Sequence, residues 1–372
     1  MNIKYLSPQL LDQAITLSDL TDPRNGSHAL QILISELHKA LSEKWSCHRM
    51  VYRSCPVVTT RDNHDDLGYP PSGASRDARY TRYLSNGVLL RTQTSAAILR
   101  LLRSIVLDPP KDLLIACPGL VYRRDVIDRL HVGEPHQLDL WRVTRGKMTK
   151  RDLEEMIQIV VETALPGRSY RTNDAVHPYT VQGVQVDVEI DGEWVEVGEC
   201  GLADPGLLQR LGMGSEISGL AMGLGLDRLL MIRKQIKDIR LLRSNDPRVS
   251  SQMQDLELYK VVSNQPGTVR DLSVCVDSSL TDEEIGDKVR ESLESDLDSL
   301  EELTLKNSTN YEELPQSARD RMGMLDNQKN VLVSLLIRHP VKTLTTEEAN
   351  RLRDRVYVVL HEGTRQELTG KK

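Results

Sequence analysis

The chain has 372 residues, of which 39% are hydrophobic and 27% charged, and its formal net charge is −6. This is the composition of a globular protein with enough apolar material for a core, and the length predicts two or three domains. No run of 18 apolar residues occurs, which excludes a membrane-spanning helix. Because the chain as a whole is acidic, a nucleic-acid partner has to meet a local basic patch.

Two residue counts narrow the class further. The five cysteines are scattered and include no CxxC pair, which argues against a disulfide scaffold or a zinc site and indicates a reducing cytoplasm. Phenylalanine is absent, although the chain has 11 tyrosines and 3 tryptophans. Chance loss of a common core residue from so long a chain is implausible, so the absence requires an explanation.

The first elements along the chain are predicted by hydrophobic spacing. Residues 28–44 place leucine and isoleucine at helical intervals, which predicts an amphipathic helix. Residues 62–82 are rich in glycine, proline, serine and charge, and we expect a long loop there. Thr149, followed three residues later by Asp152, predicts the beginning of a second helix.

A hairpin and a strand–helix unit follow. Residues 181–201 alternate apolar and polar side chains around Asp191-Gly192, a pair typical of tight turns, and this predicts two antiparallel strands. Residues 219–232, GLAMGLGLDRLLMI, predict a strand that leads directly into a helix.

The last hundred residues have the order strand, helix, strand, strand, helix. Capping boxes at Thr281 with Glu284 and at Thr345 with Glu348 begin the two helices. The expected strands are 272–276, 300–305 and 330–338. This order is typical of a split βαβ, ferredoxin-like unit.

The segment LVYRRDVIDRLHVGEPHQLD, residues 120–139, predicts a strand, a polar loop and a second strand. Arg123 at the edge of the first strand is suited to phosphate, because guanidinium is a planar and permanently charged fork. Gln137 and Asp139 share one face of the second strand, where an amide and a carboxylate can bind an ammonium group. A surface hairpin with solvated charges is the alternative, and for this segment alone it is the more common outcome.

Three further segments carry candidate polar groups. Arg228 begins the helix of GLGLDRLLMI, Ser95 lies beside an apolar run in LLRTQTSAAI, and Glu196 lies on a strand beside glycines in DGEWVEVGECG. Each has a plain structural alternative: a packed glycine-rich turn, a helix N-terminus and an outward-facing glutamate.

Taken together and in this order, the segments resemble the catalytic domain of the class II aminoacyl-tRNA synthetases, specifically the phenylalanyl-tRNA synthetase family. CPVVTT (55–60) is similar to the first motif, VYRRD…HQLD to the second, and residues 219–249 to the third motif and its tail. The C-terminal unit resembles the ferredoxin-fold anticodon-binding domain. A catalytic core and this appendage on one chain is the arrangement of the single-chain, organellar type.

This resemblance implies an α+β fold: a class II antiparallel sheet flanked by helices, plus a ferredoxin-like βαββα(β) domain. The implied domains are an N-terminal helical segment at 1–45, a catalytic domain at 46–250, a linker at 251–268 and an anticodon-binding domain at 269–372. We further expect a cytoplasmic protein without a membrane partner, and a monomer, with a homodimer as the alternative.

The resemblance implies ATP- and Mg²⁺-dependent activation of an aromatic amino acid, with phenylalanine favoured, and transfer to tRNA. Arg123 and Arg228 would be the catalytic residues, since the substrate carboxylate attacks and no protein nucleophile is needed. Glu196 is the candidate magnesium ligand. The other implied ATP contacts are Asp125, His131 and Pro135. The implied amino-acid contacts are Gln93, Ser95, Gln137, Asp139, His177, Tyr179, Glu199 and Cys200.

Several positions depart from the family pattern. Gln93 stands where the family has histidine, Asp139 where it has glutamate, and Pro135 where it has an aromatic residue that stacks on adenine. The family's Phe-Pro-Phe appears as residues 177–179, His-Pro-Tyr, and its Leu-Gly-Cys-Gly as residues 198–201, Gly-Glu-Cys-Gly.

Two explanations of these departures stay open. In the first, the chain avoids phenylalanine as a building block everywhere, including Met222 and Val274, so that it can be translated during starvation for its own amino acid. In the second, the substrate has changed, which Gln93 and Glu199 favour because neither replaces a phenylalanine. The first is slightly favoured.

Three functions therefore remain. The leading one is a phenylalanine–tRNA ligase, the second is a paralogue that activates a more polar amino acid for tRNA or a specialised pathway, and the third is a non-catalytic tRNA-binding relative. Both arginines are retained, which argues against the third.

In the C-terminal unit a solvated charged face is the alternative to tRNA contacts. The tRNA contacts expected there are Arg338, Lys342, Arg351 and Arg355.

Overall fold

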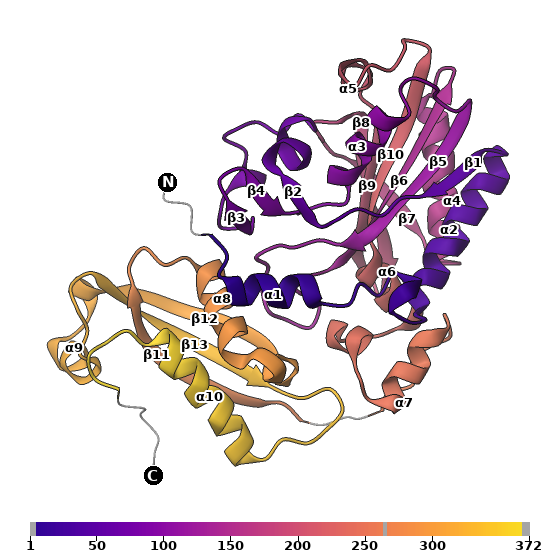
Figure 1. Ribbon diagram of the computed structural model, residues 1–372. Helices are drawn as coiled ribbons and strands as arrows, with labels where there is room; N and C mark the ends of the chain where they lie inside the picture. The colour runs from indigo at the N-terminus through magenta and orange to yellow at the C-terminus, as the bar shows by residue number, and fades with distance from the viewer. Residues whose placement is uncertain (1–4, 263–265, 367–372) are drawn as a thin grey trace. The chain divides into compact units, whose positions relative to one another are not determined.

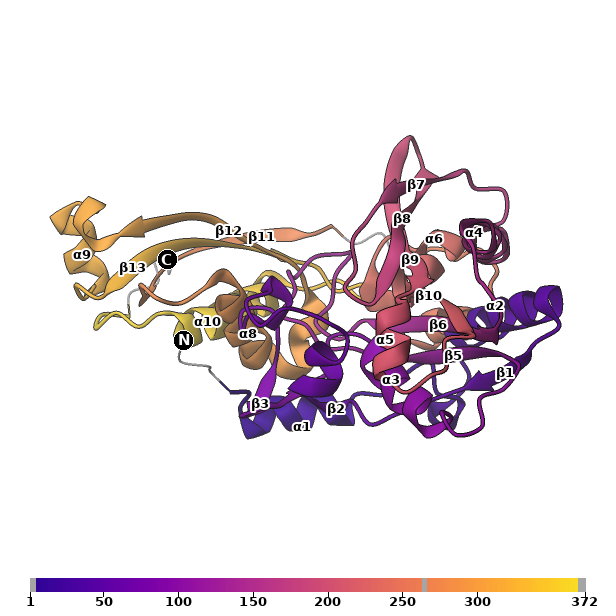
Figure 2. The same ribbon diagram turned by 90° about the horizontal axis from the view of Figure 1, so that it is seen from above.

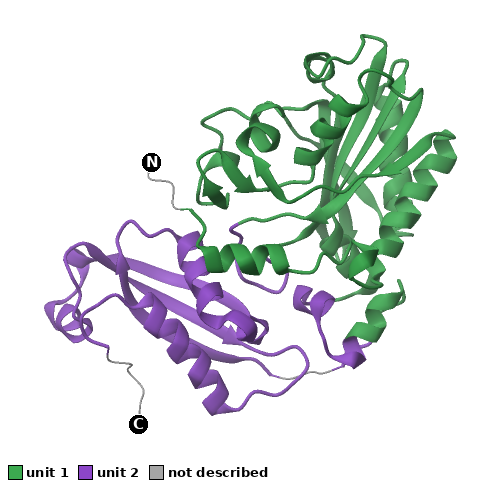
Figure 3. Cartoon of the chain, viewed as in Figure 1, with its two compact units in different colours: residues 1–123, 134–237, 250–259 green, residues 124–133, 238–249, 260–372 purple. Residues whose placement is uncertain are grey.

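The computed structural model describes residues 5–262 and 266–366 (Figures 1 and 2). Its contacts divide the chain into two compact units, coloured separately in Figure 3. Unit 1 comprises residues 1–123, 134–237 and 250–259, and unit 2 comprises residues 124–133, 238–249 and 260–372. In the described ranges, no helix combines the length and apolar character that a membrane crossing requires.

Unit 1 is built on a mixed sheet whose strand order, over the described residues, is β1-β5-β6-β10-β9-β8-β7. The pair of β1 and β5 is parallel, and the other neighbouring pairs are antiparallel. The strands are β1 (His48–Val51), β5 (Asp112–Leu120), β6 (His136–Arg145), β7 (Tyr170–Asp174), β8 (Thr180–Ile190), β9 (Glu193–Ala203) and β10 (Ile217–Gly225).

The predicted hairpin is confirmed as β8 and β9, which meet at Asp191 and Gly192. Both turn residues have positive φ, 52° and 89°, as a two-residue hairpin turn requires. The predicted strand–helix unit is confirmed as β10 followed by α6 (Leu226–Lys234). The sheet is therefore antiparallel over the part that carries the candidate site.

Helices cover both faces of this sheet. On one face α2 (Ala29–Trp45) packs against β5, α6 and α4 (Lys150–Ala164), as Figure 1 shows. The other face packs with α3 (Ser95–Ser104) and α5 (Pro205–Arg210) in a core that includes Trp141. The helices predicted at 28–44 and from Thr149 are confirmed, the latter with its capping box.

The remaining elements of this part of the chain are short. Residues 62–82 form mainly loops and turns, as expected. The α1 helix lies within the expected N-terminal helical segment at 1–45, although its bounds were not predicted. The elements are α1 (Pro8–Thr16) and a small sheet in the order β2 (Val57–Thr59), β4 (Val88–Leu90), β3 (Tyr83–Ser85), while α7 (Pro247–Ser250) lies mainly in unit 2.

Unit 2 confirms the predicted order strand, helix, strand, strand, helix. Its described strands lie in the order β11-β13-β12, with a core between the sheet and two helices. The short α9 is an addition to the predicted order. Residues 361–366 form no strand, and residues 263–265 and 367–372 lie outside the described part. The elements are β11 (Thr268–Asp277), α8 (Asp282–Leu293), β12 (Leu300–Asn310), α9 (Gln316–Met322), β13 (Gln328–Ile337) and α10 (Thr346–Leu360).

The loop 124–133 also belongs to unit 2. Ile127 packs against the core of this unit, and its carbonyl accepts a hydrogen bond of 3.0 Å from the Leu303 N–H. Buried Arg124 forms an ion pair with Asp287 at 2.8 Å. The polar loop expected between β5 and β6 is thus held by apolar, backbone and ionic contacts that its sequence pattern did not indicate.

We predict that Thr345→Ala lowers the free energy of unfolding by about 1 kcal/mol, because it removes the N-cap of α10. The Thr345 hydroxyl accepts the Glu348 N–H at 3.2 Å, and the Glu348 carboxylate accepts the Thr345 N–H at 2.8 Å. Urea unfolding measures the change. Thr346→Ala, one position into the helix, is the control, and an equal loss in that variant would contradict a capping role.

Candidate active site

The candidate site lies on the face of the large sheet that packs with α3. Gln137, Asp139 and Trp141 follow one another at two-residue spacing on β6, so their side chains point to the same face. Asp139 pairs directly with Gly223 of β10, and Gly223 pairs directly with Glu199 of β9. We call Asp139, Gly223 and Glu199 the carboxylate row. It brings two acidic side chains to the same face of the sheet.

Glycine leaves the middle of this row open. A Cβ built on Gly223 would meet no atom within 4 Å. A Cβ on Gly225, which pairs with Gln137, would meet nothing closer than the Arg228 Cβ at 3.9 Å. Gly223 and Gly225 therefore form the floor of an open space rather than a tightly packed turn.

Asp139 is buried and fully engaged with its neighbours. Its carboxylate accepts hydrogen bonds from Thr94 Oγ1 at 2.6 Å, Ser95 Oγ at 2.8 Å and Trp141 Nε1 at 3.1 Å. Burial raises its pKa, while these donors and the charge of buried Arg91 act in the opposite direction. The residue predicted to hold the substrate ammonium is thus bound by protein groups on both oxygens.

An aromatic cluster of Tyr69, Trp141 and Tyr179, which we call the aromatic wall, adjoins Asp139. The ring of Tyr179 stacks on Trp141 with 6.0 Å between centroids and 23° between planes. Tyr69 lies 6.4 Å from Tyr179, centroid to centroid. Burial raises the pKa of Tyr69 to about 12 and that of Tyr179 well above its usual value, so both phenols stay protonated.

Polar side chains border the aromatic wall. The Tyr69 hydroxyl donates to Gln93 Oε1 at 3.1 Å, and Gln93 Nε2 donates to the Asn63 carbonyl at 3.1 Å. His177 Nε2 lies 2.7 Å from Glu199 Oε2, and the hydrogen bond to His177 lowers the pKa of Glu199. A carboxylate that is ionised at neutral pH therefore lies next to the aromatic rings.

The two predicted arginines contact backbone carbonyls of two different segments. Arg228 Nη1 donates to the Glu196 carbonyl at 3.0 Å, and Arg123 Nε donates to the Thr92 carbonyl at 2.9 Å. Both cations favour the ionised form of the Glu196 carboxyl, although partial desolvation by neighbouring atoms and the charge of Glu199 leave its pKa raised. The charges of both arginines therefore act on the same carboxyl group, and Arg228 also contacts the backbone of Glu196 directly.

Glu196 is suited to magnesium in one specific way. The described residues contain no group of three His, Cys, Asp or Glu side chains that could enclose a metal ion. Mg²⁺ that accompanies a nucleotide, however, is commonly held by one or two carboxylates together with the phosphates. Glu196 is exposed and has Arg228 beside it, so it fits such a shared ion.

The other predicted residues are Cys200, Asp125, His131 and Pro135. Cys200 follows Glu199 on β9, and neighbouring strand residues face opposite sides of a sheet. Cys200 therefore faces the other side, where it pairs with Met222, a residue that lies among apolar side chains of α4. It therefore does not line the substrate space, contrary to the expectation. Asp125 and His131 belong to unit 2, where His131 Nδ1 contacts Asp128 at 2.9 Å. Pro135 remains in unit 1, and its carbonyl accepts the Val121 N–H.

The C-terminal basic residues divide into two groups. Arg338 pairs with Glu301 at 3.0 Å, and Arg355 pairs with Asp296 at 2.5 Å. Lys342 and Arg351 are exposed. The first two are therefore engaged within unit 2, and the last two are better placed to meet a polyanion.

Four residues of the site were not predicted. Trp141 carried a signal, since it continues the two-residue spacing of Gln137 and Asp139. Thr94 lies beside a predicted residue. No sequence signal indicated a site role for Arg91 or Tyr69, because their contacts join segments that are distant in sequence.

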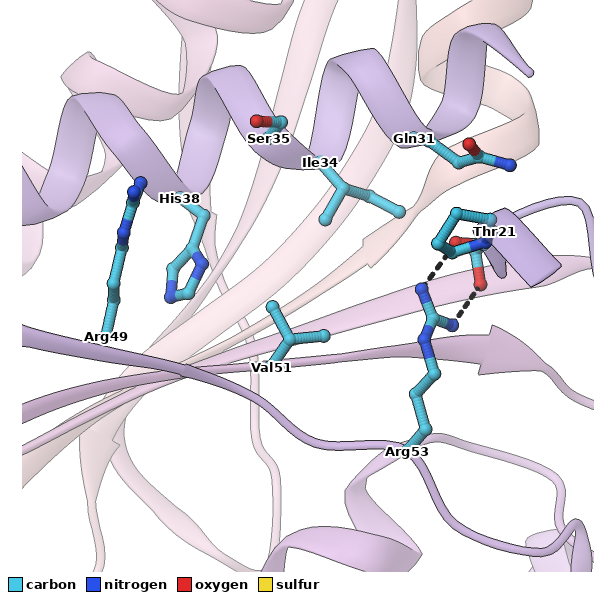
Figure 4. Close-up of a pocket in the computed structure, with 9 residues that line it drawn as sticks. Thr21, Gln31, Ile34, Ser35, His38, Arg49, Val51 and Arg53 are labelled. Carbon is cyan, nitrogen blue, oxygen red and sulfur yellow. Dashed lines mark hydrogen bonds between the residues drawn. The ribbon is translucent and has the colours of Figure 1, made fainter. Parts of the chain in front are cut away.

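A second hollow of about 470 Å³ lies between α2 and β1 (Figure 4). Arg53 donates there to Thr21 Oγ1 at 2.7 Å and to the Thr21 carbonyl, while Arg49 and His38 contribute further nitrogen atoms. None of the residues predicted to bind substrates lines this hollow.

Comparison with known proteins defines the class. Residues 16–253 match the family described as tRNA synthetases class II core domain (F). The chain belongs to this family and is an aminoacyl-tRNA ligase of class II. The expected α+β fold with an antiparallel sheet flanked by helices is thereby confirmed.

Relatives give a closer comparison. The chain is 32% identical over 244 residues to the phenylalanine–tRNA ligase alpha subunit of Nostoc sp. and 33% identical to that of Acaryochloris marina. Each match covers 65% of this chain and 71% of the relative. A pyrrolysyl tRNA synthetase structure from Desulfitobacterium hafniense is similar over 63% of this chain and 77% of that one, with 21% identity and a TM-score of 0.45.

We predict that His64 makes the fold less stable at mildly acidic pH. Its side chain is fully buried beside Tyr69, and burial lowers its pKa to about 4. The unfolded chain therefore binds a proton at higher pH than the folded chain, and stability falls as pH decreases from about 6.5 towards 4. Between pH 7 and pH 5, His64 is expected to lower the free energy of unfolding by about 2 kcal/mol.

Chemical denaturation at the two pH values measures this effect. When the pH is lowered from 7 to 5, the free energy of unfolding of the His64→Gln variant is expected to fall by about 2 kcal/mol less than that of the parent chain. Equal losses in the two proteins would show that His64 does not carry the pH dependence.

Proposed function

We propose that this chain activates an aromatic amino acid with ATP and transfers the aminoacyl group to tRNA. The observation that supports this most directly is the position of Arg228, which borders the open space over Gly223 and Gly225 and donates to the Glu196 carbonyl at 3.0 Å. Arg123 supplies a second positive charge that acts on the Glu196 carboxyl. The positive charges and the aromatic wall with its polar neighbours suit the two parts of an aminoacyl-adenylate.

In the proposed first step, the substrate carboxylate attacks the α-phosphorus of ATP and pyrophosphate leaves. Arg123 and Arg228 stabilise the charge that accumulates on the phosphoryl oxygens, which is the main contribution a protein makes to such a transfer. In the second step, a ribose hydroxyl of tRNA attacks the acyl carbon and AMP leaves. Neither step needs a protein nucleophile.

Glu196 would hold Mg²⁺ together with the ATP phosphates, and the ion would neutralise charge on the leaving pyrophosphate. The exposed position of this carboxylate next to Arg228 supports that role. Gln137, on the same face as Asp139, would orient the substrate ammonium.

The aromatic wall supports an aromatic side chain as substrate, since a ring packs favourably on the partly exposed Tyr69 and Tyr179. The relatives are named phenylalanine–tRNA ligase alpha subunits, so phenylalanine is the first amino acid to test. The ion pair of His177 and Glu199 favours, as a second candidate, a more polar amino acid.

We further infer that the protein works in the cytoplasm, a location supported by its five free cysteines. A monomer, with a homodimer as the alternative, stays a prediction; both arginines and the aromatic wall come from one chain. The anticodon-binding role of unit 2 is likewise a proposal.

We predict that Arg228→Ala lowers the rate of ATP–pyrophosphate exchange by about 10²–10³-fold, because a preorganised donor to the transition state is removed. The measurement uses phenylalanine and other aromatic amino acids. Exposed Arg151 on α4 provides the control, since Arg151→Ala removes a cation of the same kind away from the site. An unchanged rate in Arg228→Ala would contradict the proposed role.

We predict that the double variant Lys342→Glu, Arg351→Glu weakens tRNA binding and makes it less dependent on salt. For each phosphate that the variant no longer neutralises, the slope of log K against log salt should decrease by about 0.7–0.9. Lys150→Glu with Arg151→Glu, an exposed basic pair at the beginning of α4, reverses the same charge elsewhere. If both double variants weaken binding equally, the effect is one of net charge alone.

A further inference from the structure

The two acids of the carboxylate row differ in how far they are available to a substrate. The side chain of Asp139 is only 2% exposed, and three protein donors bind its oxygens. The side chain of Glu199 is 44% exposed, and His177 takes one of the roughly four lone-pair positions that a carboxylate offers. Glu199 is therefore the more accessible anionic acceptor beside the open space over Gly223.

Glu199 is fixed in place rather than loosely solvated. His177 is almost buried, with 10% of its side chain exposed, and its Nε2 lies 2.7 Å from Glu199 Oε2. The lowered pKa of Glu199 keeps it ionised at neutral pH. An oriented and ionised carboxylate forms stronger hydrogen bonds than a neutral acceptor.

The position of Glu199 associates it with the substrate side chain rather than with the ammonium group. Its partner His177 has its ring centroid 6.0 Å from that of Tyr179, a member of the aromatic wall. The donors Thr94 and Ser95 are instead directed at Asp139, on the other side of Gly223. A ring that packs on the aromatic wall thus meets an acceptor at its edge.

We propose that Glu199, oriented by His177, selects an aromatic amino acid whose ring carries a hydrogen-bond donor, such as a phenolic hydroxyl, over phenylalanine. This inference rests on the proposed function. A ring without a donor would take water away from the Glu199 carboxylate and return no hydrogen bond. Sites built to bind a substrate hydroxyl reject the analogue that lacks it by about 10⁴–10⁵-fold.

ATP–pyrophosphate exchange with phenylalanine, tyrosine and meta-tyrosine tests the proposal in the full-length chain. We expect kcat/KM for at least one hydroxylated substrate to exceed that for phenylalanine by about 100-fold or more. Glu199→Ala is expected to reduce this ratio at least about tenfold, through a decrease confined to the hydroxylated substrates. Glu193→Ala, at an exposed position of the same strand, is the matched control and is expected to leave the ratio unchanged.

The possible outcomes separate this inference from the proposed function. Exchange that favours phenylalanine, with a ratio that Glu199→Ala does not change, overturns the selection by Glu199 and leaves the ligase activity in place. An equal decrease for all three substrates assigns Glu199 to the common ammonium group and also overturns it. Exchange with none of the aromatic amino acids removes the proposed function itself.

A second variant protects the test against misfolding. Glu199→Gln keeps the size of the side chain and removes its charge, and Glu199→Ala is compared with it for thermal unfolding. If only the alanine variant unfolds early, the ratio is taken from the glutamine variant, for which we expect a smaller decrease in the same direction. No decrease in that folded variant counts against the proposal.

Discussion

The site depends on one geometric constraint, the direct pairing of Asp139, Gly223 and Glu199 across three antiparallel strands. Paired residues face the same side of a sheet, so two carboxylates are brought to one surface by backbone hydrogen bonds. Glycine at the middle position leaves room between them. A shift of one residue in either pairing would send one of the acids to the opposite face, where Cys200 and Met222 lie.

Burial then gives the two acids different properties. Asp139 lies in the core, and its carboxylate accepts hydrogen bonds from hydroxyl and indole donors. These bonds connect the beginning of α3 to β6. Glu199 has one imidazole partner and remains half exposed. The same chemical group is thus fixed inside the protein at one position and presented to a ligand at the other.

The absence of phenylalanine has a structural counterpart in this site. Tyr179 and Trp141 stack where apolar rings would also pack, so aromatic contact is preserved without phenylalanine. Simple avoidance of phenylalanine accounts for Tyr179 and for apolar core positions such as Met222 and Val274. It does not account for Glu199 or Gln93, whose polar contacts give the site a different chemical character.

Hydrophobic spacing and capping residues by themselves determined most of the elements, including the hairpin at Asp191-Gly192 and the helices that begin after Thr149 and Thr345, because these signals act within a few residues. The motif order determined the family and the two arginines. Only the tertiary structure decided that Asp139 is saturated, that Cys200 faces away and that the loop 124–133 packs in unit 2. Those outcomes depend on strand register and on partners far apart in sequence, such as Thr94 with Asp139 or Ile127 with Leu303, which no local pattern encodes.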